Sequence, residues 1–205
     1  MKKTYLSSCS SALVLAAGLF AATFPAAGQS ILININQANP SAVQFTTTGA
    51  NSFVASSVSN LFGVDLISYF TASVVSSGGV ATGTLTPAGT TSAYNQWVPD
   101  TLHALNNADL NLYVTTTSQI QTFTNSIPAF TGTAIVNLSS LFASLPATGA
   151  SGNIYSGDAH SQGGLLIGRW TVVPEPSVEA QLALGAMVFA GLALVRRARR
   201  VAARR

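Results

Sequence analysis

Short apolar runs with alternating polar positions dominate the middle of the chain. Residues 110–115 (LNLYVT) are apolar at every second position, and residues 43–47 (VQFTT) alternate in the same way. A period of two is typical of a β-strand with one buried face. Similar runs occupy residues 31–36, 134–138 and 165–172. These patterns predict a strand in each of the five ranges.

Turn-forming residues separate these runs. Glycine, proline, serine and asparagine cluster at residues 77–79, 86–89, 126–128, 148–153 and 162–164. Short strands with turns at this spacing predict an all-β fold, as a single β-sandwich or jelly-roll-like domain. Its length, residues 29–173, is that of one domain.

Three further ranges break the simple pattern. The long apolar run at residues 63–75 predicts a strand, a bend or a short helix. Residues 99–107 predict one helical turn, because Asp100 or Thr101 is suited to cap its first N–H groups. Residues 139–145 predict a second helical turn.

The N-terminal residues 1–28 have the features of a secretory signal peptide. Lys2 and Lys3 precede an apolar run at residues 12–22, and small residues follow. We therefore expect cleavage between Gly28 and Gln29. The alternative is an uncleaved anchor, but the run is shorter than the roughly 20 apolar residues that span a bilayer.

The C-terminal residues 174–205 combine a proline-rich motif, an apolar segment and a basic tail. Pro174, Glu175 and Pro176 precede a run at about 178–195, which as a helix would be about 27 Å long. That length is close to the thickness of the hydrocarbon core. A cluster of arginines follows and should remain in the cytoplasm: Arg196, Arg197, Arg199 and Arg200.

This arrangement resembles the PEP-CTERM sorting signal. The family usually has Ser-Thr after the motif, whereas this chain has Ser177-Val178. The resemblance covers about the last 30 residues, and the signal peptide at the other end agrees with it. It implies recognition at Pro174-Glu175-Pro176 by an exosortase, a membrane transpeptidase, and transfer to the cell surface or extracellular polysaccharide. The alternative is a single-span anchor whose stalk contains this tripeptide by chance.

The net charge of +3 belongs to the two ends of the chain. Of nine basic residues, only Arg169 lies between Lys3 and Arg196. Residues 29–173 contain four aspartates, so their net charge is −3. Because nucleic-acid binding needs a basic patch on the folded part, this class of function is excluded.

Acid–base and metal-binding groups are scarce in residues 29–173. This range has no cysteine, lysine or glutamate, and Cys9 would leave with the signal peptide. Asp158 and His160 are close in sequence, but a metal site needs further ligands. The other candidate groups have ordinary structural explanations: Asp65, Asp100, Asp109 and His103. We expect no catalytic residues, no metal and no cofactor, and therefore no enzymatic activity.

Aromatic side chains are the remaining candidates for a binding site. Exposed rings on a β-sheet stack on sugars, so Tyr94 and Trp97 are possible glycan contacts, with packing in the core as the alternative. Trp170 lies in the last predicted strand and is expected to be a core residue.

These features together predict an exported protein, anchored in the membrane as a precursor and then moved to the cell surface or extracellular matrix. The β domain is expected to be structural or adhesive, associated with the exopolysaccharide of a biofilm. A carbohydrate-binding module is the alternative, followed by a hydrolase of matrix polysaccharides.

Overall fold

A computed structural model describes residues 30–59, 61–99, 108–115, 119–157 and 164–174. Several predicted features lie outside this part of the chain. They are the signal peptide with Gly28 and Gln29, the helical turn after Pro99 with Asp100 and Thr101, His103, Asp158, His160, Glu175, Pro176, the apolar segment at 178–195 and the arginine cluster. In the described residues, no helix is long and apolar enough to cross a membrane.

The described chain consists mainly of short strands. They are β1 (Ile31–Asn36), β2 (Val43–Thr47), β3 (Ser56–Ser59), β4 (Val64–Leu66), β5 (Gly79–Gly83), β6 (Thr86–Pro87), β7 (Gln96–Pro99), β8 (Leu110–Tyr113), β9 (Ile120–Phe123), β10 (Phe130–Thr131), β11 (Thr133–Val136), β12 (Ser151–Ser156) and β13 (Leu166–Val172). Two 3₁₀ helices, η2 (Pro40–Ala42) and η3 (Ser139–Ser144), follow β1 and β11.

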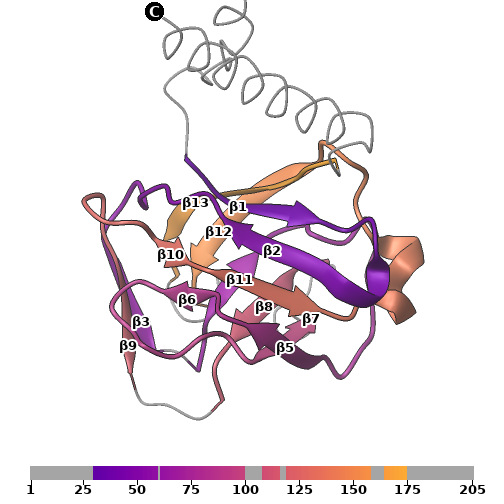
Figure 1. Cartoon of the computed structure of the whole chain (residues 1–205), viewed down its shortest axis with the longest axis horizontal. Helices are drawn as coiled ribbons and strands as arrows, with labels where there is room; N and C mark the ends of the chain where they lie inside the picture. Colours follow the sequence, from indigo (N-terminus) through magenta and orange to yellow (C-terminus); the bar gives the residue numbers. More distant parts are fainter. Residues whose placement is uncertain (1–29, 60, 100–107, 116–118, 158–163, 175–205) are drawn as a thin grey trace, which may run out of the picture.

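Nine of these strands form one closed barrel, in the order β1-β13-β12-β4-β8-β7-β5-β11-β2 (Figure 1). Because β1 pairs with both β13 and β2, the order returns to its first strand. The pair β1–β13 is parallel, and the other barrel pairs are antiparallel. The strands β3 and β9 form a separate ribbon, and β6 and β10 form another.

The all-β prediction is confirmed, but the predicted sandwich or jelly roll is corrected to a closed barrel. A sandwich consists of two sheets, and each sheet has two edge strands. Here the first and last barrel strands along the chain, β1 and β13, pair with each other. Alternation of apolar residues indicates which face of a strand is buried. It does not indicate which strands are neighbours, so the sequence could not distinguish the two architectures.

The strongest alternating patterns did form strands. The runs that begin at residues 31, 43, 110, 134 and 165 correspond to β1, β2, β8, β11 and β13. The second helical turn is confirmed as η3. The apolar run at 63–75 contains β4 and then a turn and irregular chain.

Strands that are rich in serine and glycine were missed. The clearest case is β12, because residues 148–153 were predicted to be a turn. Gly152 lies in this strand beneath a tryptophan: a Cβ atom at this position would be 2.6 Å from Nε1 of Trp170. Such a distance is shorter than a non-bonded contact allows. The glycine is therefore present because of side-chain packing, and a turn was the wrong interpretation.

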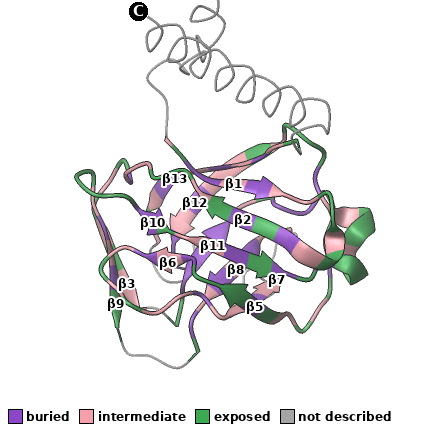
Figure 2. Ribbon diagram, in the orientation of Figure 1, coloured by how far each residue is buried: buried purple, intermediate pink, exposed green. Residues whose placement is uncertain are grey.

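Aromatic rings fill the interior of the barrel. Trp170, which is 1% exposed, lies 5.5 Å from Tyr69 between ring centroids, and Tyr69 lies 5.9 Å from Phe45. A second aromatic group belongs to the two ribbons and not to the barrel strands: Phe123 of β9 lies 5.4 Å from Phe130 of β10 between ring centroids. Figure 2 shows buried positions alternating with exposed or half-buried ones along strands such as β2 and β11. The prediction that Trp170 is a core residue is confirmed.

The packing of Trp170 predicts a large effect of its removal. We expect Trp170→Ala to lower the free energy of unfolding by about 3–5 kcal/mol, because a large buried ring leaves a cavity. Urea unfolding of the full-length chain in detergent, followed by circular dichroism, measures this change. The control Val75→Ala alters a side chain that is 87% exposed and should change stability by less than about 0.5 kcal/mol. Equal effects of the two substitutions would contradict the packing argument.

Candidate functional site

The last barrel strand leads directly into the predicted sorting motif. After β13 ends at Val172, the N–H of Val173 still donates a hydrogen bond to the carbonyl oxygen of Ile35, at 2.9 Å. The next residue, Pro174, is exposed. The N–H of Val172 donates on the other side of the strand, to the carbonyl oxygen of Ala150, and Pro174 cannot repeat that bond two residues later because proline has no N–H. The sheet therefore holds the chain up to the residue before the motif.

The two ends of the described domain leave the barrel at opposite ends. β1 and β13 run in the same direction, with Ile31 beside Arg169 and Ile35 beside Val172. The chain enters at Ser30, whose carbonyl oxygen accepts a hydrogen bond from the Arg169 N–H at 2.9 Å. We call the barrel end at which β13 finishes the exit end; it includes η2, η3 and the connection at residues 67–78.

Backbone hydrogen bonds join the parts of the exit end. The N–H of Leu138, just before η3, donates to the carbonyl oxygen of Pro40 in η2 at 2.8 Å. The N–H of Gly149 donates to the carbonyl oxygen of Val172 at 2.9 Å. The amide of Gln37 also bonds to the carbonyl oxygen of Pro146. The point where the chain leaves the barrel is thus part of a connected surface.

The exposed face of four barrel strands is built mainly from hydroxyl and amide groups, with the exposed apolar side chains of Val80 and Ile135 among them. The strands β1, β2, β11 and β5 contain no ionisable side chain. Asn34 pairs with Thr46, and Thr46 pairs with Thr133, so these residues form a row across three strands. The hydroxyl of Thr133 donates to that of Thr46 at 3.2 Å. We call this surface the polar face, which consists of Asn34, Asn36, Val80, Thr82, Gln44, Thr46, Thr133 and Ile135.

Tyr94 and Trp97 do not provide an exposed aromatic surface. Their side chains are 1% and 4% exposed, so the predicted glycan contacts at these residues are wrong and core packing is correct. The hydroxyl of Tyr94 donates to Oε1 of Gln121 at 2.7 Å, and Nε2 of Gln121 donates to the carbonyl oxygen of Gly63 at 2.5 Å. Trp97 lies in β7, where the buried residues Trp97 and Pro99 alternate with the half-buried residues Gln96 and Val98, whereas Tyr94 lies before this strand.

The aspartates within the described residues lie on neighbouring strands. Asp65 in β4 pairs with Asn111 in β8, which puts Asp109 diagonally across from it. Asp109 precedes β8, as its sequence position suggested, and Oδ1 accepts a hydrogen bond from the N–H of Ser68 at 2.5 Å. Asp65 is 0% exposed. A glycosidase needs two carboxylates that reach the sugar, and the burial of Asp65 does not fit that role.

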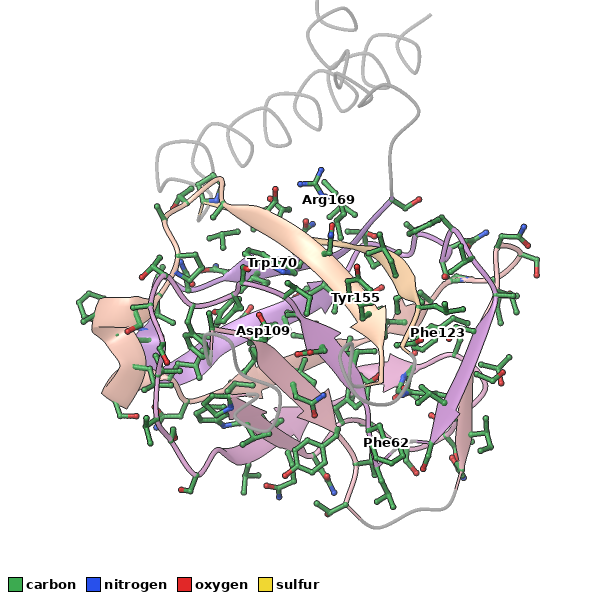
Figure 3. The ribbon with its side chains drawn as sticks, turned by 180° about the vertical axis from the view of Figure 1, so that it is seen from behind. Phe62, Asp109, Phe123, Tyr155, Arg169 and Trp170 are labelled. Atoms are coloured by element: carbon green, nitrogen blue, oxygen red, sulfur yellow. The ribbon has the colours of Figure 1, made fainter. Side chains whose placement is uncertain are left out.

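Arg169 and Asp109 lie at different places on the barrel (Figure 3). Nη2 of Arg169 donates to the hydroxyl of Ser151 at 2.8 Å, so its partner is a neutral group on the neighbouring strand β12. Within the described ranges, no group of three or more histidine, cysteine, aspartate or glutamate side chains is placed to hold a metal ion.

Comparisons with protein-family models, with curated proteins and with solved structures found no match to this chain.

The buried tyrosines predict a loss of stability in alkaline solution. Burial raises the pKa of Tyr94 and Tyr69 above the usual value of about 10, because it disfavours the charged phenolate. The contribution of these protonated tyrosines to the free energy of unfolding is fully present below pH 10. It is lost as the pH rises from 10 towards the raised pKa. The expected slope is up to about 1.4 kcal/mol per pH unit for each tyrosine.

The same unfolding measurement between pH 9 and pH 11 checks this expectation. In Tyr94→Phe the decline should be less steep than in the parent chain, whatever the stability of the variant at neutral pH. Parallel declines in the two proteins would show that Tyr94 does not cause the alkaline loss.

Proposed function

We propose that the chain is an exported precursor that an exosortase processes at Pro174-Glu175-Pro176. The order of the segments supports this proposal: a signal peptide, one domain, the motif, an apolar segment and an arginine cluster. Pro174 comes one residue after Val173, whose N–H makes the last sheet hydrogen bond in the described part of the chain, and this position carries the proposal furthest. A cut beyond this point would separate the tail without removing any barrel strand.

The barrel itself would be a structural or adhesive module, with no enzymatic activity, at the cell surface or in the extracellular polysaccharide of a biofilm. Its closed sheet has no unpaired barrel edge, which suits a stable exported domain. About a quarter of residues 29–173 are serine or threonine. Hydroxyl groups form hydrogen bonds with water and so keep such a surface hydrated. On most proteins charged side chains have this role.

The polar face supports a second candidate function, the binding of neutral polysaccharides. Hydroxyl and amide groups donate and accept hydrogen bonds, as sugar hydroxyls do. The row of Asn34, Thr46 and Thr133 repeats at the distance between strands, about 4.8 Å. This distance is close to the length of one sugar in an extended chain. A hydrolase has less support, because Asp65 is buried.

Loss of the motif's carboxylate should block processing. In a host that contains an exosortase, we expect Glu175→Ala to leave the precursor with its C-terminal tail, whereas the parent chain ends near the motif. Intact-mass measurement of surface material distinguishes these products. The control Glu179→Ala removes a carboxylate outside the motif and should be processed normally. An unchanged mass for Glu175→Ala, or parent protein that still ends at Arg205, would contradict the proposal.

Loss of two hydroxyls from the polar face should weaken the retention of the chain by a neutral polysaccharide. We expect the double variant Thr46→Val/Thr133→Val to be retained less by cellulose than the parent, both in detergent. The matched control is Thr86→Val/Thr131→Val, which changes a cross-strand threonine pair on the ribbon β6–β10. Equal retention of all three proteins would rule out the polar face as the binding surface.

A further inference from the structure

The exit end of the barrel carries the two most exposed large apolar side chains of the described chain. Phe142 in η3 is 66% exposed, and Val75 in the connection from β4 to β5 is 87% exposed. The two segments are joined, because the N–H of Thr71 donates to the carbonyl oxygen of Ser144 at 2.9 Å. Figure 1 shows η3 beside the turn from β1 to β2, on the side towards which β1 runs.

Among the described residues, the segments around Phe142 contain little charge. η3 has the sequence SSLFAS, and η2 is PSA. Asp109 is the described carboxylate at this end, and its Oδ1 accepts a hydrogen bond from the Ser68 N–H. An apolar side chain among hydroxyl groups is suited to the boundary between lipid headgroups and acyl chains. The nearby polar groups can stay hydrated there.

The chain beyond Val173 sets how far this surface can lie from a membrane. If the apolar segment begins at Val178, five residue steps separate it from Val173, whose N–H makes the last barrel hydrogen bond among the described residues. An extended chain of that length reaches at most about 18 Å. The headgroup layer on each side of a bilayer takes up about 5–8 Å of this distance. The exit end is therefore held close to the lipid surface in the precursor.

We propose that the exit end docks on the bilayer before processing, with Phe142 in the interfacial layer. This inference rests on the proposed membrane-anchored precursor and goes beyond it. The docked barrel keeps Pro174 at the membrane surface, where a membrane-embedded transpeptidase works. Removal of the tail leaves only a small apolar contact, made by Phe142 and Val75, so the processed domain is released.

The test uses the full-length chain with Cys9→Ser, reconstituted in phosphatidylcholine vesicles. A fluorophore is attached at Ala143→Cys, an exposed position next to Phe142. Lipids with a nitroxide near the headgroup quench the fluorophore if it lies in the interface. The control label is at Ile127→Cys, because Ile127 is 46% exposed but belongs to the opposite end of the barrel.

We expect quenching of the label at residue 143, little quenching at residue 127, and loss of most of the quenching at 143 when Phe142→Ser is added. Absence of quenching at 143, equal quenching at both positions, or no effect of Phe142→Ser would overturn the docking. Sedimentation with the vesicles separates the two proposals. Chain that sediments without quenching retains its anchor but does not dock, whereas chain that does not sediment contradicts the anchor itself and the docking with it.

Discussion

The parallel pairing of β1 with β13 is the constraint on which the rest of the structure depends. It joins the first and last strands of the described domain, and it turns a sheet of nine strands into a closed barrel. Without it, both strands would present unpaired backbone groups, which are sites of aggregation. The same strand β13 also pairs with β12, and that second pairing positions Trp170 over Gly152, while the indole ring lies against Tyr69. Closure and core packing therefore depend on the same strand.

Contacts between distant parts of a chain are expensive to form, because the loop between them loses entropy. In this protein the closing contact spans nearly the whole domain, so the barrel cannot be completed until residues 166–172 are available. The domain has few charges to keep an incomplete sheet soluble. We infer that burial of aromatic rings such as Trp170 and Tyr69 compensates for the cost of this distant closure.

The sequence predicted the barrel strands in which apolar and polar residues alternate. It did not predict strands whose residues are determined by contacts with distant parts of the chain. β2 and β8 have the period of two that a half-buried strand requires, and both were predicted. β12 depends on Gly152 beneath Trp170, a contact between residues 18 positions apart, which no local pattern reveals. Tyr94 and Trp97 were ambiguous for the same reason. An aromatic residue in an alternating strand can face either side, and the neighbouring strands decide which side is buried.

The candidate site shows a similar division between local and distant information. The motif at Pro174 is visible in the sequence because it depends on the order of nearby residues. Its spacing from the barrel is not, because that depends on where the sheet ends. The hydrogen bond from Val173 to Ile35 defines this point.

A stalk of several free residues before Pro174 would let a protease reach the motif whether or not the barrel had formed. With one residue between the last strand and the motif, the folded barrel lies against any enzyme that binds there. Under the proposed function, the exosortase then has to bind a short motif directly beside a bulky folded domain. Its cut must fall after the strand that closes the barrel, so processing removes the anchor and preserves the fold.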